Sequence, residues 1–231
     1  MANNSLDPLT GLLNRKAFDE LFHASFVQAS QDGTPLSLAF FDLDNFLGVN
    51  QTFGHPGGDA VLKTVADTVS QVVGGRGQVA RYGGDEFAVI FAGLEREQAF
   101  LIMEQVRVAV ESLSQFSEGE TRVETKITIT GGVAAHPIDG SDENELIRKA
   151  DGALYRAKVN GRNKIALAYE ERMIPKTAHY TQTQLERLTE LASEQGVSEA
   201  VLLREALDDL LIKYKHNFLF FDQLKGKTQP A

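Results

Sequence analysis

A nearly continuous apolar run, residues 35–41, passes directly into the acids Asp42 and Asp44. A run of this kind is typical of a strand that is buried on both faces of a sheet. Carboxylates at the end of a core strand are costly unless they pair with a cation or bind one. Because ligands of helix-covered sheets commonly bind outside the strand ends, the run favours a site at this edge of the sheet.

A second acidic pair follows a predicted hairpin. A Gly-Gly pair at 83–84 separates two apolar runs and predicts a two-residue turn with positive φ, which glycine adopts without steric cost. Asp85 and Glu86 come directly after it. Taken alone, the pair is explained as readily by a solvated turn. Two acidic clusters at the ends of core strands together favour a shared Mg²⁺ site, completed by water and substrate phosphates.

Composition limits the class of protein. The 231 residues are enough for one full domain and a smaller module, and 42% of them are hydrophobic. The chain has no cysteine, which excludes disulfides and thiolate metal sites. The polar first residues and the absence of a long apolar run lead us to expect a cytoplasmic protein without a membrane partner. A net charge of −9 argues against a protein that coats nucleic acid.

Hydrophobic periodicity predicts an α/β sandwich with a mostly antiparallel central sheet. Asn14 is expected to cap the first helix and Ser141 the last helix of this domain. The polar segment 118–125 is expected to be a loop or an edge strand. In chain order we expect a helix to 31, a strand at 36–42, a segment at 45–53 that leads into a glycine-rich turn at 54–58, and a helix at 59–73. The hairpin follows, then a helix at 95–114, a strand at 126–135 with a bulge or bend at its Gly-Gly pair, a helix after 141, and a strand at 165–168.

Several short motifs occur in a fixed order along the chain: Asp7-Pro8-Leu9-Thr10-Gly11-Leu12, Asp42-Leu43-Asp44, Asn50, Gly54-His55, Gly58-Asp59, Arg81 to Phe87, and Ala157 to Asn163. Together they resemble the GGDEF diguanylate cyclase family over about residues 5–167. A lone GGDEF string would be weak, but an ordered set of motifs is specific. The resemblance implies a nucleotidyl-cyclase-like, ferredoxin-like palm sandwich for residues 1–170.

The resemblance implies an enzyme that condenses two GTP molecules into cyclic di-GMP and two pyrophosphates at a homodimer interface. It implies Mg²⁺ or Mn²⁺ held by Asp42, Asp85 and the Leu43 carbonyl, with Asp85 and Glu86 as the catalytic acids. In the family, the position of Asp85 is assigned as the proton acceptor. A metal-bound carboxylate is a poor base, so activation of the attacking 3′-hydroxyl by the metal is expected to matter more.

The resemblance also implies residues that bind the substrate. The guanine readers are Asn50 and Asp59, the phosphate-binding cations are Lys158 and Arg162, and the amides around Asn45 and Phe46 are expected to cradle the β- and γ-phosphates. The alternative role of Asp59 is that of an acid in the first turn that stabilises its helix, and both roles can coexist. For the two cations, the alternative is stabilisation of the helix C-terminus.

The chain departs from the family pattern near the phosphate-binding residues and at the product-inhibition motif. Leu47 stands where the family usually has a lysine for the γ-phosphate, and Gln51 replaces a common Asp. We therefore expect weaker GTP binding or a lower rate. The family's product-inhibition motif is Arg-x-x-Asp, and its charged positions here are Gly74 and Gly77. We expect no product inhibition through that site.

Residues 171–231 resemble a ribbon-helix-helix module, with a short strand at 176–181 and helices at 182–194 and from 198. Such a unit buries its core only as a dimer. Thr177 and His179 are the candidate DNA-facing side chains. Pro175 stands where a basic residue is frequent, and seven Lys and Arg face eight Asp and Glu from 176 to 231. This balance favours dimerisation over DNA binding.

Two alternative functions stay open at the level of the sequence. The first is a DNA-binding transcriptional regulator whose GGDEF domain senses GTP or cyclic di-GMP. The second is a weak GTP-binding scaffold, suggested by Leu47. The apolar residues 218–221 have no assigned role beyond packing on the dimer or on a partner.

Overall fold

The computed structural model describes residues 5–168, 177–195, 198–200, 202–203, 206–207 and 210. The chain divides into two compact units, Met1–Glu171 and Arg172–Ala231, and each unit is described by itself. Within the described residues, no helix combines the length and apolar character that a membrane crossing requires.

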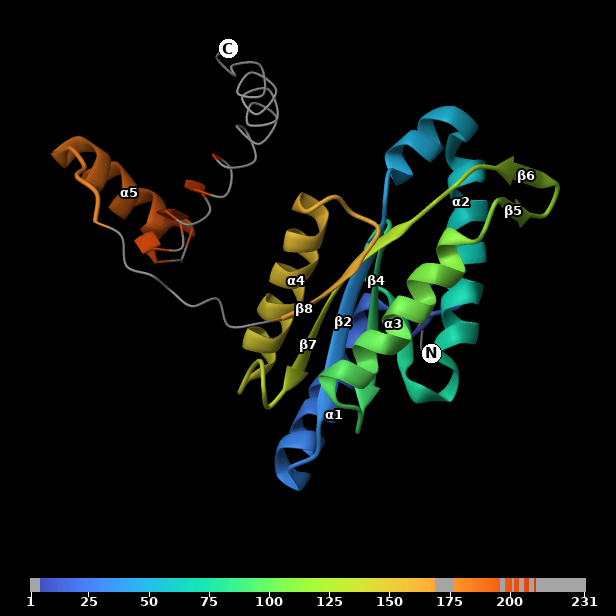
Figure 1. The fold of residues 1–231 in the computed structure, drawn as a ribbon, viewed down its shortest axis with the longest axis horizontal. Helices are drawn as coiled ribbons and strands as arrows, with labels where there is room; N and C mark the ends of the chain where they lie inside the picture. The colour runs from blue at the N-terminus through green and yellow to red at the C-terminus, as the bar shows by residue number, and fades with distance from the viewer. Residues whose placement is uncertain are drawn as a thin grey trace, which may run out of the picture. The chain divides into compact units, whose positions relative to one another are not determined.

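A mixed six-stranded sheet organises the first unit, with the strand order β1-β3-β4-β2-β7-β8 (Figure 1). The central strand β2, Leu36–Leu43, is buried along all 8 residues, as its apolar run predicts. It pairs antiparallel with β4 and β7, whereas the outer pairs β1–β3 and β7–β8 are parallel. The other strands are β1 (Leu13–Asn14), β3 (Gln78–Arg81), β4 (Glu86–Ala92), β7 (Ile129–His136) and β8 (Ile165–Leu167).

Helices cover both faces of this sheet, which confirms the predicted α/β sandwich (Figure 1). Because side chains alternate along a strand, β2 feeds two cores. Leu38 and Phe40 join the core with α1 and α4, and Phe41 joins the core with α2 and α3. The helices are α1 (Arg15–Asp32), α2 (Phe46–Val73), α3 (Arg96–Glu111) and α4 (Glu143–Val159).

The helix caps follow the sequence closely. Asn14 caps α1 as predicted, because its side-chain oxygen accepts a hydrogen bond from the Ala17 N–H at 3.0 Å. The predicted cap of α4 is wrong by one residue. Asp142, not Ser141, accepts from the Glu145 N–H at 2.9 Å, while the Ser141 N–H donates to the Glu145 carboxylate. Both residue types suit the position, so sequence preference alone does not separate them.

The helix predicted at 59–73 is longer than expected, because the segment before it and the predicted turn 54–58 both belong to one kinked helix, α2. The bend lies at Gly54, whose φ of 69° and ψ of 178° interrupt the helical backbone. Pro56 stands just after the bend, where its missing N–H costs no helical hydrogen bond. The kink turns the first half of α2 back toward the glycine pair 57–58, which places the residues of the site described below.

The predicted two-residue hairpin turn is wrong. Residues 82–85 connect β3 and β4, and neither Gly83 nor Gly84 has a positive φ. The Tyr82 and Gly83 N–H groups both donate to the Glu86 carbonyl, at 2.8 and 3.1 Å. These hydrogen bonds close a loop that is longer than two residues and in which neither glycine is left-handed. Asp85 and Glu86 therefore lie at the end of a wider turn than expected.

The Gly-Gly pair of β7 makes no bulge. Gly131 and Gly132 pair in regular register with Phe41 and Phe40. A Cβ on Gly132 would lie 2.2 Å from two backbone atoms of α4, the Ala150 oxygen and the Leu154 nitrogen. Glycine is therefore required here because the helix backbone approaches the strand closely, not because the strand bends.

The remaining elements lie near the ends of the predicted ones. The polar segment 118–125 contributes to a small hairpin, β5 (Gln115–Glu118) and β6 (Thr121–Glu124), and α3 ends before 114. Gly74–Arg76 forms a short 3₁₀ turn, η1. In the second unit, α5 spans Gln182–Gln195, and the described residues after Ser198 are helical.

The predicted ribbon stays a prediction. Residues 177–181 lie outside any helix or strand, and a ribbon strand would pair only with a second chain. Residues 175–176 and the apolar segment 218–221 lie outside the described residues.

Gly132→Ala tests the close approach of α4 to β7. The added methyl group would overlap backbone atoms that cannot rotate away, so we expect the free energy of unfolding to fall by about 3 kcal/mol. Gly75→Ala is the matched control, because a Cβ there meets nothing within 4 Å. Denaturant unfolding measures both variants, and equal stability of the two would contradict this packing.

Candidate active site

Four predicted site residues meet at one edge of the sheet. Asp42, in β2, lies directly opposite Glu86, in β4. The next residue, Leu43, donates its N–H to the Asp85 carbonyl at 3.3 Å. Asp42 is buried and Glu86 is exposed. The antiparallel register therefore brings together the two acidic clusters that lie more than 40 residues apart in the sequence.

Asp42 is paired with Lys158, which reaches it from the last turn of α4. Burial raises the pKa of the Asp42 carboxyl above its usual range, although the hydrogen bond and the charge of Lys158 act in the opposite direction. The nearby charges of Asp44 and Asp85 raise this pKa further. Negative charge is thus crowded at the edge of the sheet, and an additional cation would relieve it.

The donor set fits a magnesium or manganese ion that arrives with a phosphate ligand. Among the described residues, no group of three or more His, Cys, Asp or Glu side chains is arranged to hold a metal by itself. Two carboxylates, Asp42 and Asp85, and the Leu43 carbonyl are hard oxygen donors. Mg²⁺ commonly uses one or two carboxylates and completes its shell with water and phosphate oxygens.

The start of α2 offers backbone amides next to these acids. Asn45, the N-cap, has left-handed backbone with a φ of 59°, and its side chain makes no capping hydrogen bond. The first N–H groups of a helix lack intrahelical partners and favour an anion. Leu47 lies in this first turn and is 69% exposed, so the position where the family has a lysine adds no charge.

The kink in α2 positions the predicted guanine readers. A Cβ on Gly58 would lie 2.0 Å from the Asn50 Oδ1 atom and 3.1 Å from the Phe46 ring. Asn50 therefore lies against the residue that precedes Asp59. Asn50 is half-buried and Asp59 is exposed, so both side chains are accessible to solvent. The sequence signal for this contact is the Gly-Gly pair, which we had assigned only to a turn.

The loop that carries Asp85 is held by Arg81. Its guanidinium donates to the Gly84 carbonyl at 2.8 Å and to Asp7 Oδ1 at 3.2 Å. Asp7 also accepts hydrogen bonds from the Thr10 N–H and hydroxyl, at 2.9 and 2.7 Å. Burial acts to raise the pKa of Asp7, but these hydrogen bonds and the Arg81 charge outweigh it and hold the pKa below its usual range. The N-terminal turn thus supports the site, a role that the motif alone did not reveal.

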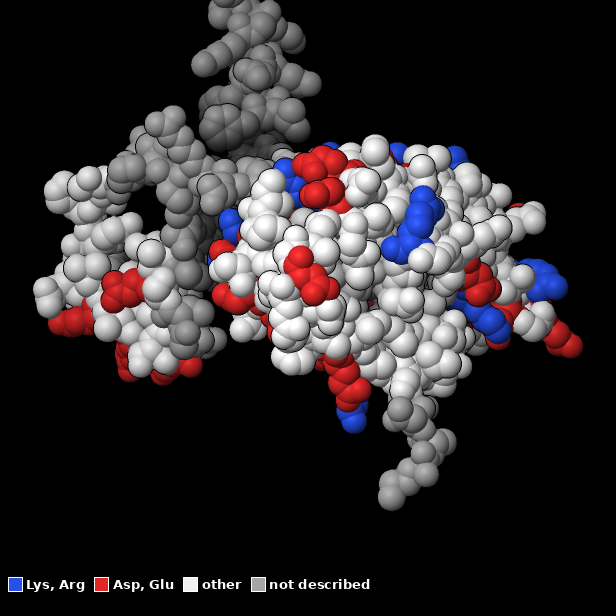
Figure 2. All heavy atoms as spheres, turned by 90° about the horizontal axis from the view of Figure 1, so that it is seen from below, with Lys and Arg blue, Asp and Glu red and all other residues white. Residues whose placement is uncertain are grey.

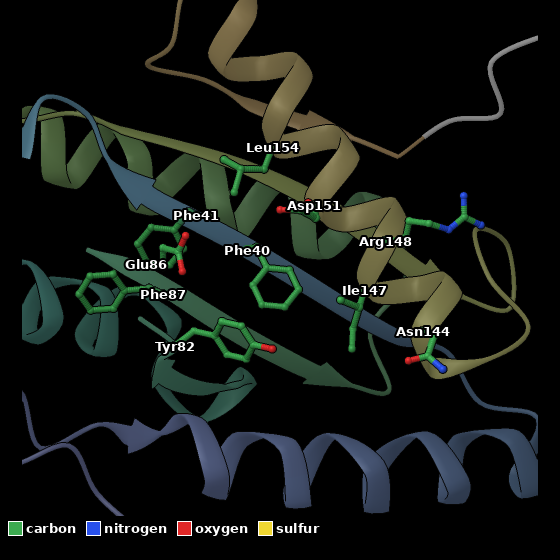
Figure 3. A pocket seen from close by; sticks show the side chains of 10 residues that line it. All are labelled: Phe40, Phe41, Tyr82, Glu86, Phe87, Asn144, Ile147, Arg148, Asp151 and Leu154. Carbon is green, nitrogen blue, oxygen red and sulfur yellow. The ribbon is translucent and has the colours of Figure 1, made fainter. Parts of the chain in front are cut away.

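Glu86 also borders a pocket on the α4 side of the sheet. Figure 3 shows Glu86 among the side chains that line it, with Phe40 and Tyr82 on the sheet side and Ile147 and Leu154 on α4. The cavity has a volume of about 320 Å³. The polar edge that Glu86 belongs to is therefore continuous with an aromatic surface.

Arg162 does not lie on the same helix as Lys158. Their spacing of four residues predicts a shared helix face. That prediction is wrong, because α4 ends at Val159 and Gly161 turns the chain with a φ of 105°. Arg162 follows in left-handed backbone, and its Nε atom lies 3.8 Å from Asp44 Oδ1. Its side chain is 63% exposed, so the cation remains accessible beside the acids.

The candidate DNA-facing residues belong to the second unit. Thr177 and His179 are both exposed, which is compatible with either role predicted for this module. On α5, Leu185 and Leu191 are 41% and 44% exposed, whereas Ala192 is buried. Leu188 is half-buried. The apolar stripe that helical spacing predicts from Leu185, Leu188, Leu191 and Ala192 is thus partly uncovered in the described residues.

Lys158→Met tests the competition for Asp42. Without the ammonium group, we expect the nucleotide-free protein to bind Mn²⁺ about tenfold more tightly, because an opposing positive charge has gone. Lys63→Met is the matched control, since Lys63 pairs with Glu118 at 2.7 Å outside the site. Titration followed by electron paramagnetic resonance gives both affinities. An unchanged affinity in Lys158→Met would contradict the proposed ligand set.

A comparison with known families places these motifs together. The family model described as "Diguanylate cyclase, GGDEF domain" matches residues 4–164. "Probable diguanylate cyclase DgcT" of Escherichia coli is 38% identical over 162 residues, which are 70% of this chain and 35% of that protein. "Response regulator PleD" of Caulobacter vibrioides is 36% identical over 159 residues, which are 69% and 35%. The chain spans about a third of the length of these curated relatives.

Solved structures agree with this match. The GGDEF domain of DgcB from Caulobacter crescentus, in complex with c-di-GMP, has a TM-score of 0.68 at 34% identity and covers 74% of this chain and 96% of that one. The active GGEEF domain of a diguanylate cyclase from Vibrio cholerae has a TM-score of 0.63 at 32% identity, with coverages of 69% and 99%. By its family match, its fold and its motifs, this chain belongs to the GGDEF family of diguanylate cyclase domains.

Proposed function

We propose that this protein is an Mg²⁺-dependent diguanylate cyclase, which condenses two GTP molecules into cyclic di-GMP and two pyrophosphates at a homodimer interface. The observation that carries the proposal is the meeting of Asp42, Leu43 and Asp85 at one edge of the sheet, with Lys158 facing them. The names of the relatives as diguanylate cyclases support it.

The reaction consists of two equivalent phosphoryl transfers. In each, the 3′-oxygen of one GTP attacks the α-phosphorus of the other. A new P–O bond forms, the bond from the α-phosphorus to the bridging oxygen breaks, the hydroxyl proton is released and pyrophosphate leaves. Two loaded domains must face each other, because each supplies one nucleotide.

We assign the ion and the catalytic acids from the donor set. Asp42, Asp85 and the Leu43 carbonyl would hold Mg²⁺ or Mn²⁺, which supplies charge neutralisation and activation of the attacking hydroxyl. Asp85 and Glu86 are the proposed catalytic acids. Lys158, which pairs with Asp42 in the free protein, is proposed to turn its ammonium group to the nucleotide's phosphates.

The remaining site residues select and hold GTP. Asp59 can accept hydrogen bonds from guanine N1–H and N2–H₂, which adenine cannot offer together. The Asn50 side chain lies against Gly58, the residue that precedes Asp59. Arg162 and the amides of Asn45 and Phe46 are proposed to bind the phosphates. With Leu47 in this first turn, one cation fewer holds the leaving pyrophosphate, which favours weak GTP binding or a reduced rate.

Product inhibition through the family's usual motif is not expected. A Cβ on Gly77 would lie 2.8 Å from the Phe91 ring and 2.9 Å from the Ile90 carbonyl oxygen. A side chain at position 77 would therefore require the β3–β4 region to shift. Gly74, the other position of the motif, likewise has no group that could bind a phosphate.

We propose that the second unit supplies the dimer. The exposed apolar side chains of α5 fit a second copy of the same helix pair, as a ribbon-helix-helix module requires. A constitutive dimer would raise the local concentration of the partner domain to about a millimolar scale. The DNA-binding role of Thr177 and His179 is the alternative, and no observation of the described residues favours it over dimerisation.

Product formation from GTP and Mg²⁺ tests the cyclase proposal directly. We expect cyclic di-GMP from the wild type and a rate about a thousandfold lower from Asp85→Ala, which corresponds to a loss of about 4 kcal/mol in the barrier. Asp67→Ala, an exposed acid on α2, is the control. Absence of product from a well-folded wild-type dimer would reject the proposal and favour the GTP-binding scaffold.

Leu185→Glu tests the dimer proposal. A carboxylate on the apolar face of α5 would have to be desolvated at the interface, so we expect the dimer dissociation constant to rise about a hundredfold. Ser193→Glu adds the same charge to an exposed position outside the predicted apolar stripe and should leave it unchanged. Sedimentation velocity over a concentration series measures both, and an equally stable dimer in Leu185→Glu would place the interface elsewhere.

A further inference from the structure

Asp44 is a buried carboxylate of the site to which no role has been assigned. Its oxygens point to groups of the protein: Oδ1 accepts from the Thr130 hydroxyl at 2.7 Å, and Oδ2 accepts from the Thr128 hydroxyl at 2.7 Å. Oδ2 also accepts from the Asn163 N–H at 3.2 Å. The side chain is 9% exposed, so this carboxylate is bound on both oxygens by internal donors.

Left-handed backbone is concentrated around this carboxylate. Among the described residues, the non-glycine residues with positive φ are Asn45, Arg162 and Asn163, at 59°, 58° and 46°. Asn45 follows Asp44 directly, and Asn163 donates its N–H to it. Such conformations are costly for residues with a Cβ and persist where surrounding contacts enforce them. All three positions adjoin or contact Asp44.

A second group of bonds fixes the far side of the Arg162–Asn163 turn. The Asn163 side chain accepts from Arg107 at 3.0 Å and donates to Glu111 at 2.7 Å, both on α3. The Asn163 N–H is shared with the Thr130 hydroxyl, at 3.0 Å. The turn is thus held between α3, β7 and Asp44, and its geometry is set before any ligand binds.

The two left-handed segments carry the proposed phosphate contacts. One segment leads into the first amides of α2, and the other presents the accessible guanidinium of Arg162. Asp44 connects them, because its main chain belongs to the first and its carboxylate binds the second. A displacement of either segment would move the first amides of α2 away from the guanidinium of Arg162.

We propose that Asp44 is a positioning residue that holds both phosphate-binding segments in their left-handed conformations. This inference rests on the proposed function, since it concerns the phosphates of the same nucleotide. Asp44 need not touch substrate or metal to act in this way, because its hydrogen bonds are all directed to the protein.

Asp139 provides a matched control for the loss of a buried carboxylate. It is 7% exposed and accepts from the Ala135 N–H at 2.9 Å and from Arg96 at 2.8 Å. It lies beyond the opposite end of β7, away from the site. Its removal should lower stability as the removal of Asp44 does, without moving the phosphate-binding segments.

The experiment compares Asp44→Ala, Asp44→Asn and Asp139→Ala in the full chain. For each variant we would measure thermal unfolding, kcat and KM for GTP, and calorimetric binding of inorganic tripolyphosphate with Mg²⁺. We expect Asp44→Ala to weaken tripolyphosphate binding and raise KM about tenfold and to lower kcat/KM about a hundredfold. Asp44→Asn keeps the shape and loses the charge, so we expect about a threefold effect. Asp139→Ala should retain the wild-type affinity.

The outcomes separate the inference from the proposed function. If Asp44→Ala loses stability as Asp139→Ala does but keeps its tripolyphosphate affinity, Asp44 is only structural and the inference is overturned. Should Asp44→Ala not fold, an unchanged affinity in Asp44→Asn overturns it. A wild type that forms no cyclic di-GMP but binds tripolyphosphate rejects the cyclase alone. A wild type that binds no tripolyphosphate rejects both.

Discussion

The burial of β2 up to its acidic end is the constraint on which the rest of the structure depends. All 8 residues of this strand are buried, and Asp42 lies among them while Asp44 follows directly. Desolvated carboxylates are costly, so the fold must bring partners to them. Lys158 forms an ion pair with Asp42. Two threonine hydroxyls and a backbone amide donate hydrogen bonds to Asp44. The partners of these acids are also the groups that surround the proposed phosphate site.

The two faces of the sheet contribute differently to this site. Helix α4 delivers Lys158 to the same face as Asp42, and Gly132 lets that helix approach the strand backbone closely. On the other face, α2 begins beside the acids and folds back at Gly54, which places Asn50 against Gly58. The proposed metal ligands, phosphate-binding groups and guanine readers therefore come from separate layers, and the central strand holds these layers in register.

The net charge of the protein does not favour long-range attraction of an anionic ligand. The face shown in Figure 2, which is seen from below Figure 1 and is not the end of the sheet that carries the acids, mixes acidic and basic side chains and has no extended basic patch. The net charge of −9 agrees with this view. Binding of a nucleotide would therefore depend on a few placed cations and backbone amides with a divalent ion, rather than on long-range attraction. The exposed Leu47, where the family has a lysine, makes each remaining cation more important.

Local patterns predicted much of the first unit. The apolar run of β2, the cap at Asn14 and the alternation of helices and strands depend on neighbouring residues, and the structure has them. Errors arose where a residue type serves two purposes. Glycine pairs suggested a tight turn at 83–84 and a bulge in β7, but the first lies in a wider loop and the second admits a helix. A glycine can be needed for a turn or for the close approach of another backbone. Only the position of that other backbone distinguishes the two cases, and the spacing of residues in the sequence does not give it.

The sequence by itself determined the family motifs, the central strand and the identity of the acids that end it, because these are written in residue type and short-range order. Tertiary structure alone decided how the acids are satisfied. Asp44 meets Asn163 across 119 residues, and Asp42 meets Lys158 from the end of another helix. Such contacts depend on the register of β2 with β4 and β7 and on where α4 stops. They are collective results of packing, and no single stretch of the chain encodes them.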